Sequence, residues 1–331
     1  MKKTVYVGQY AGGETCGINV LSVDDVTGAI EQVNFIGGLS NTLWLTLSPD
    51  ASRLYAARNG GITLFDVRGS ELVVSSEYDV GTVAEPCHMS LSADGGRLYF
   101  SEYRDAVCGI VDVVSGKTAS VTLVGKGPNL ARQEKAHAHC AVETPDGLHL
   151  CVVDLGSDAI WLFDPVTLEP HGKVHTEPGV GPRHLVFHPN GRIACLVYEL
   201  GNVVTSFRYE NGVFSPLETL PILPEGFSGH SQAAALKFSE DGKRFFATNR
   251  GHDSVVTLDI SPEGGRMRLK ACSPLGGSWP RDFTLLPGER IALACLERAG
   301  EVRSFSYDKA TGLFTALPHA FRTHRPVVAV V

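Results

Sequence analysis

The chain has 331 residues, of which 43% are hydrophobic and 20% are charged, and its mean hydropathy of +0.03 lies close to zero. This composition is typical of a globular protein that is long enough for a large core. Lys and Arg number 29 against 36 Asp and Glu, which gives a net charge of −7. This balance argues against a nucleic-acid partner, because phosphate binding requires clustered lysine and arginine.

Membrane insertion and export are not expected either. No apolar run approaches the ~20 residues of a membrane span, and the start of the chain lacks the long apolar stretch of a secretory signal. The eight cysteines are scattered without a C-x-x-C pair, which argues against a zinc ribbon and against a redox dithiol. We therefore expect a cytoplasmic protein with reduced thiols.

One turn motif, followed by an apolar strand, occurs six times along the chain. The copies start at residues 48, 92, 144, 188, 239 and 286, so that successive copies lie 44 to 52 residues apart. Four of them contain Asp-Gly or Asn-Gly, as in Ser92-Ala-Asp-Gly95 and His188-Pro-Asn-Gly191, and such pairs supply the positive φ that a tight hairpin needs. Each turn is predicted to join two antiparallel strands. The copy at residues 286–292 is read as one residue shorter than the others.

Repeats of this length predict the four-stranded antiparallel blades of a β-propeller. A short apolar strand precedes each turn, as at residues 184–187, and a third strand follows the second, as at residues 159–163. The two ends supply a further blade, because residues 4–7 read as one of its strands and residues 326–331 as the inner strand that precedes it.

We predict an all-β fold in which residues 1–331 form a single seven-bladed β-propeller domain. Strands from the N- and C-termini complete one blade and thereby close the ring, which removes exposed sheet edges. A pair of β-sandwiches is the alternative, and the repeat disfavours it because the repeat runs through the middle of the chain without a linker.

Several short motifs carry a family resemblance that extends essentially from end to end. They are Tyr6-Val-Gly-Gln-Tyr10, Pro86-Cys-His88, Gly127-Pro-Asn129 with Arg132-Gln133, His137-Ala-His139, Gly181-Pro-Arg183 and its continuation to Gly191, Glu199-Leu200, Asn249-Arg250 and Pro280-Arg-Asp-Phe283. With these blocks in this order, the sequence resembles the lactonase family of seven-bladed propellers. That family includes bacterial cycloisomerase-type 6-phosphogluconolactonases and fungal carboxymuconate lactonizing enzymes.

Polar residues recur at fixed distances from the repeat turns. Five residues before a turn start lie Cys87, His139, Arg183 and Arg281; four before lie His88, Cys140, His184 and Asp282; and eleven after lie Glu199 and Arg250. Equivalent positions of a propeller lie at one height around its axis, so we expect the polar residues to surround one mouth of the central channel. Buried charges near an axis are costly without partners or a ligand.

The chemistry of this pocket points to a small anionic substrate, a sugar lactone or organic acid. Arginine forks such as Arg183, Arg250 and Arg281 bind carboxylate or phosphate oxygens, and we predict that His88, His137, His184 and Asp282 also contact the substrate. For lactone hydrolysis, Glu199 would deprotonate water, Arg183 would stabilise the oxyanion and His139 would protonate the ring oxygen, or the His and Glu roles would be exchanged. The resemblance implies the same three catalytic residues, His139, Arg183 and Glu199. Arginines beside Glu199 lower its pKa and weaken it as a base, and burial would offset this.

The predicted enzyme is a lactone hydrolase that uses neither metal nor cofactor. Motifs for a serine nucleophile, a zinc protease, a P-loop and a dinucleotide site are missing from the sequence, and calcium would require more carboxylate ligands than this rim offers. The leading substrate is 6-phosphogluconolactone, from the pentose phosphate pathway. A carboxymuconate-type cycloisomerase and a non-catalytic ligand-binding propeller are the alternatives, and a monomer or weak homo-oligomer is expected.

Overall fold

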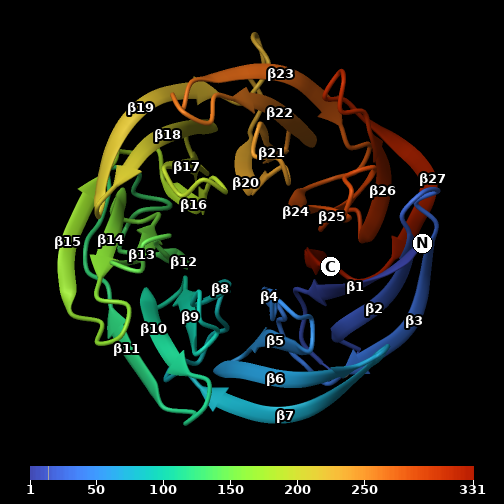
Figure 1. Cartoon of the computed structure of the whole chain (residues 1–331), viewed down its shortest axis with the longest axis horizontal. Coiled ribbons are helices and arrows are strands. Elements are labelled where there is room, and N and C mark those ends of the chain that lie inside the picture. Colours follow the sequence, from blue (N-terminus) through green and yellow to red (C-terminus); the bar gives the residue numbers. More distant parts are fainter. Residues whose placement is uncertain (14) are drawn as a thin grey trace.

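A computed structural model describes residues 1–13 and 15–331 of the chain. The regular elements are strands, and they form seven four-stranded antiparallel sheets arranged in a ring (Figure 1). In order around the ring, the sheets are β28-β1-β2-β3 (Pro326–Val330, Lys2–Gln9, Gly17–Asp24, Ile30–Gly37), β4–β7 (Leu45–Leu47, Arg53–Arg58, Gly61–Arg68, Glu71–Asp79), β8–β11 (His88–Leu91, Arg97–Glu102, Val107–Asp112, Thr118–Thr122), β12–β15 (Ala138–Glu143, Leu150–Asp154, Ala159–Phe163, Pro170–His175), β16–β19 (Pro182–Phe187, Ile193–Tyr198, Val203–Glu210, Val213–Pro221), β20–β23 (Gln232–Phe238, Arg244–Arg250, Ser254–Ile260, Met267–Pro274) and β24–β27 (Pro280–Leu285, Ile291–Leu296, Glu301–Tyr307, Phe314–Arg322). The predicted seven-bladed propeller is confirmed.

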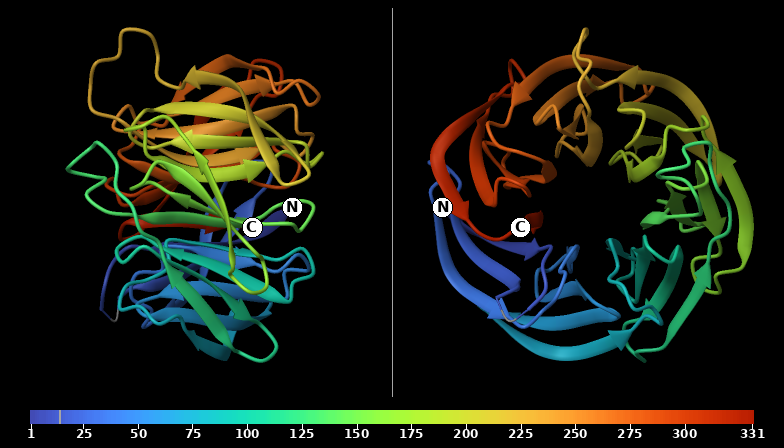
Figure 2. Two further views of the ribbon diagram at one scale, coloured as in Figure 1. Left: turned by 90° about the vertical axis from the view of Figure 1, so that its left-hand side faces the viewer. Right: turned by 180° about the vertical axis from the view of Figure 1, so that it is seen from behind.

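The first strand of each sheet lies beside the central channel and the last lies at the rim (Figures 1 and 2). The six predicted turns join the first and second strands of their sheets, and each is closed by a backbone hydrogen bond from its first residue to the sixth, as from Ser92 to Arg97 (2.9 Å). The predicted ring closure is also confirmed, because β28 pairs antiparallel with β1, with Val7 opposite Ala329.

Apolar side chains fill the spaces between neighbouring sheets. One cluster joins Ile18 and Val20 of β2 to Leu54 and Phe65 of the next sheet, and each of these four side chains is at most 1% exposed. Similar clusters lie at the other junctions. This packing fixes the seven inner strands around the channel, and so it fixes the position of any side chain that those strands direct inward.

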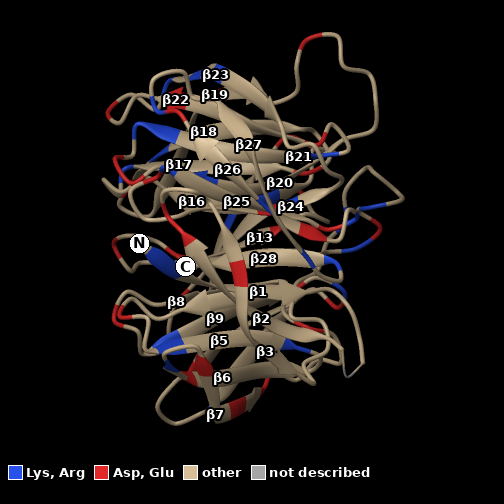
Figure 3. Cartoon of the chain, turned by 90° about the vertical axis from the view of Figure 1, so that its right-hand side faces the viewer, with Lys and Arg blue, Asp and Glu red and all other residues tan. Residues whose placement is uncertain are grey.

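Acidic and basic residues are interspersed on the strands and on the connections between them (Figure 3). Within the described residues, no helix is long and apolar enough to cross a membrane.

Candidate active site

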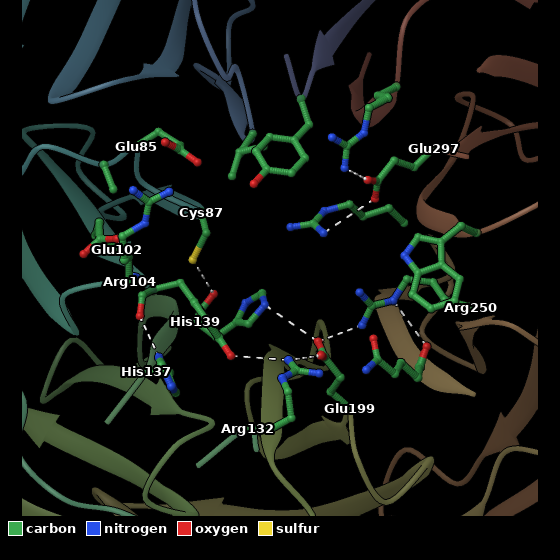
Figure 4. Close-up of a pocket in the computed structure, with 18 of the residues that line it drawn as sticks. Glu85, Cys87, Glu102, Arg104, Arg132, His137, His139, Glu199, Arg250 and Glu297 are labelled. Carbon is green, nitrogen blue, oxygen red and sulfur yellow. Dashed lines mark hydrogen bonds and ion pairs between the residues drawn. The ribbon is translucent and has the colours of Figure 1, made fainter. Parts of the chain in front are cut away.

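A cavity of about 600 Å³ opens at one end of the channel, on the side where the second strands of the sheets end (Figure 4). Every sheet contributes to its wall, for example through Tyr10 after β1, Leu43 before β4 and Tyr103 after β9. Its volume lies within the range of small-molecule sites. The predicted residues His137, His139, Glu199, Arg250 and Arg281 line it.

Three of the inner strands have a β-bulge at a predicted site residue. The pairing of β12 with β13 skips His139, that of β16 with β17 skips Arg183, and that of β24 with β25 skips Arg281. A bulge inserts an extra residue into one strand and changes the direction of its side chain. The residues five positions before these turns are therefore structurally equivalent, as the constant spacing in the sequence indicated.

Glu199 follows directly after β17 and is held by its backbone. Its N–H donates to the carbonyl oxygen of Gly181 at 2.8 Å. Gly181 has a φ of +59°, and a Cβ there would lie 2.7 Å from Leu200 Cγ. A residue with a side chain would strain this turn, so the glycine permits the close approach that places Glu199.

The Glu199 carboxylate is the centre of a buried charge cluster and is only 2% exposed. Its Oε2 lies 2.7 Å from Arg250 Nη2 and 3.1 Å from Arg183 Nε, and its Oε1 lies 2.6 Å from Arg132 Nη2. His139 Nε2 lies 3.9 Å from Glu199 Oε2, which is too long for a direct hydrogen bond. A water molecule or a substrate oxygen can bridge a gap of this length.

Electrostatics fix the protonation of both groups. Burial raises the pKa of Glu199, but Arg250, Arg183, His139 and Arg132 together outweigh it and hold that pKa well below its usual range. Burial and the charge of Arg183 lower the pKa of His139 far below its usual value, against the opposing effect of Glu199. At neutral pH the cluster therefore contains a carboxylate that resists protonation and a neutral imidazole. Burial does not offset the arginines, so the lowered pKa makes Glu199 a weak proton acceptor, as the lowered pKa of His139 does for the imidazole.

Arg183 lies beneath Glu199 and is outside the cavity wall. It is 2% exposed, and its Nη1 donates to the carbonyl oxygen of Ala234 at 2.7 Å and lies 3.1 Å from His184 Nε2. Burial and Arg250 lower its pKa to about 9, so it remains charged at neutral pH. Arg132 and Arg250 do line the cavity, and they present cationic N–H groups where Arg183 was expected to do so.

The residues predicted to bind substrate lie at different depths along the channel. His184 lies below the cavity, with ring centroids 5.3 Å from His139 and 5.4 Å from His88. His88 lines a second cavity, of about 800 Å³, beside the β4–β5 and β8–β9 turns at the other end of the channel. Asp282 Oδ2 accepts the N–H of Ala329 at 2.9 Å. The expectation that His88, His184 and Asp282 surround the same mouth as His139 was wrong, because consecutive residues of an inner strand lie at different depths.

His137 does line the cavity, but both of its ring nitrogens already have partners within the protein. It stacks on Tyr103 at 4.2 Å between centroids, Nδ1 lies 2.9 Å from the Tyr103 carbonyl oxygen, and Nε2 lies 3.1 Å from Glu134 Oε1. Its edge faces the Glu134 side of the cavity.

Glu297 is a functional candidate that sequence counting missed. The sixth turn has full length, because Leu286 N–H bonds to the carbonyl oxygen of Ile291 at 2.8 Å, as His188 does to that of Ile193. The prediction that this turn is one residue shorter was wrong. With a shorter turn, the position equivalent to Glu199 would fall on Leu296 rather than on Glu297. Glu297 N–H bonds to the carbonyl oxygen of Trp279 at 3.0 Å, the counterpart of the bond between Glu199 and Gly181.

Glu102 and Cys87 also lie in the cavity wall, and burial raises the pKa of the Glu102 carboxyl. Burial raises the pKa of the Cys87 thiol to about 12, so this residue is not a thiolate nucleophile at neutral pH. Within residues 1–13 and 15–331, no group of three or more His, Cys, Asp or Glu side chains is placed to hold a metal ion.

Fold and site together define a propeller with a polar, arginine-rich cavity at one mouth of its channel. Over residues 4–331 the sequence matches the family described as "Lactonase, 7-bladed beta-propeller". The chain therefore belongs to this family.

Particular relatives resemble it over their whole length. The 6-phosphogluconolactonase of Bacillus subtilis is 28% identical, over 97% of this chain and 96% of the relative. The solved structure of a periplasmic gluconolactonase of Pseudomonas aeruginosa is 28% identical and has a TM-score of 0.91, over 100% of this chain and 99% of that one. An uncharacterized protein of Lactococcus lactis is 30% identical over 95% of both chains.

Proposed function

We propose that the protein hydrolyses the lactone of a sugar acid. The observation that carries this proposal is the neutral His139 imidazole, 3.9 Å from the ionised Glu199 carboxylate, at the wall of an arginine-lined cavity. Lactone hydrolysis needs a base that is unprotonated at neutral pH, an anionic group that stabilises the resulting cation, and donors for an oxyanion. The cavity contains all three.

In the proposed reaction, His139 accepts a proton from water as the water oxygen attacks the lactone carbonyl carbon. Glu199 stabilises the imidazolium that forms, and the N–H groups of Arg132 and Arg250 stabilise the oxyanion. As the intermediate collapses, the bond between the carbonyl carbon and the ring oxygen breaks, and the imidazolium returns its proton to that oxygen. This assignment gives the role of base to His139, as in the exchanged alternative. Glu199, however, transfers no proton, because ion pairs with Arg132, Arg183 and Arg250 occupy both of its oxygens.

The leading substrate is 6-phosphogluconolactone, with the unphosphorylated gluconolactone as the comparison. Two relatives are named for these activities, and the excess of arginine in the cavity favours an anionic ligand. We further propose that the reaction takes place in the cytoplasm as part of the pentose phosphate pathway. The presence of all eight cysteines as free thiols is compatible with that compartment.

The proposal is tested with His139→Gln and a matched control, His175→Gln, which changes an exposed histidine of the outer strand β15. Loss of a general base lowers rates about 10²- to 10⁴-fold, so we expect a fall of this size in kcat for His139→Gln and none for His175→Gln. Full activity of His139→Gln would refute the mechanism. Wild-type protein that converts carboxymuconate but neither lactone would favour the cycloisomerase.

A further inference from the structure

A bulged arginine with a glutamate 16 residues after it occurs in two of the sheets that surround the cavity. Arg183 and Glu199 belong to the β16–β19 sheet, and Arg281 and Glu297 repeat them in the β24–β27 sheet, with the same separation of 16 residues. Both arginines occupy β-bulges, and both glutamates are held by equivalent backbone hydrogen bonds. The two pairs flank the sheet that carries Arg250.

The two pairs differ in how their arginines are used. Arg183 is buried and donates to Glu199 and to Ala234. Arg281 Nη1 lies 3.7 Å from Glu297 Oε2, and its side chain is 20% exposed. In the part of the chain that the structure describes, Arg281 donates no hydrogen bond that meets ordinary geometry. In the first pair the arginine N–H groups are used within the protein, whereas in the second pair the Arg281 guanidinium can still donate hydrogen bonds to a ligand in the cavity.

The surroundings of Arg281 are cationic and aromatic. Arg325 bonds Glu297 Oε1, and its guanidinium lies 4.3 Å from the Tyr10 ring centroid. Arg298 covers Trp279 at 3.3 Å. Because Glu297 is the one carboxylate in contact with Arg281 and Arg325 among the described residues, this side of the cavity keeps a net positive charge.

We infer that Arg281 binds a terminal oxyanion of the substrate, a phosphate monoester or a second carboxylate, while the lactone end faces Glu199 and His139. An open guanidinium fork matches two oxygens of such a group, and Arg325 and Arg298 add charge at the rim. Glu297 holds the guanidinium against the wall without occupying its donors. This inference rests on the proposed function for the position of the lactone end.

The test measures binding of stable acids, so that it does not depend on turnover. Calorimetry compares gluconate with 6-phosphogluconate and with the dicarboxylate glucarate, for wild-type protein, Arg281→Gln, Arg281→Lys and Arg322→Gln. Arg322 is an exposed arginine of β27 in the same sheet and serves as the matched control. Charge-assisted hydrogen bonds of this kind correspond to about 10- to 100-fold in affinity.

We expect wild-type protein and Arg322→Gln to bind 6-phosphogluconate at least about 10-fold more tightly than gluconate. Arg281→Gln should lose most of that preference and leave gluconate binding unchanged, and Arg281→Lys should retain part of it. If glucarate matches 6-phosphogluconate, the site accepts either oxyanion; if it matches gluconate, the site selects phosphate.

Three results would overturn the inference. They are equal binding of all three acids by wild-type protein, no binding of any of them, and an equal loss for every ligand in Arg281→Gln. Absence of lactone turnover together with the expected binding pattern would reject the proposed reaction but retain the oxyanion site.

Discussion

Glu199→Gln removes the charge that three arginines share. Arg183 and Arg250 are 2% and 4% exposed, so the substitution leaves two buried guanidinium groups uncompensated. Breaking a buried ion pair by removing one partner costs about 3–5 kcal/mol. With an unfolding entropy of about 2.1 cal/mol/K per residue over 331 residues, this corresponds to a decrease in Tm of ~4–7 °C. Turnover should also be lost, because the imidazolium has no anionic partner.

Differential scanning calorimetry measures this decrease, with Glu289→Gln as the control. Glu289 is also buried, at 3% exposure, but its ion pair is with Lys309, whose side chain is 55% exposed, so we expect a smaller decrease there. A Glu199→Gln protein as stable as wild type would refute the charge cluster as described.

Two predictions concern pH. Because burial and Arg183 keep the pKa of His139 far below its usual value, kcat/KM should stay level from pH 8 to pH 6; a half-loss near pH 6.5 in a lactonase assay would contradict this. Burial and Arg183 also lower the pKa of His184 in the folded protein. As the pH falls below about 6.5, this histidine takes up a proton in the unfolded chain but not in the folded protein, so the free energy of unfolding decreases. The loss is up to about 1.4 kcal/mol per pH unit for each such histidine. Urea titrations at pH 7.5 and 5.5 should show a smaller loss for His184→Gln, and an unchanged loss would count against the buried neutral ring.

The fold could be predicted from the sequence because its information is local. Each turn joins strands that are neighbours in the chain, and residues such as Gly95 and Gly191 adopt the positive φ, +70° in both, that the Asp-Gly and Asn-Gly pairs indicate. Counting from those turns also identified His139, Arg183 and Arg281 as equivalent positions, and the structure places a β-bulge at each of them.

Other features depend on contacts between distant segments. Arg132 lies on the connection between β11 and β12, and its ion pair with Glu199 joins residues 67 positions apart. The depth of Asp282 follows from the direction of its side chain after the bulge at Arg281, and His88 lines the cavity at the other end of the channel. The sequence shows neither feature. Glu297 could have been predicted, because it repeats the spacing of Arg183 and Glu199, but the misread turn at Leu286 concealed it.

The most direct test of the central claim is the rate of ring opening of freshly prepared 6-phosphogluconolactone by the wild-type protein, with spontaneous hydrolysis subtracted and EDTA present in a parallel sample. The account predicts catalysed hydrolysis that exceeds the rate with unphosphorylated gluconolactone and that EDTA does not change. No acceleration of either lactone would contradict it.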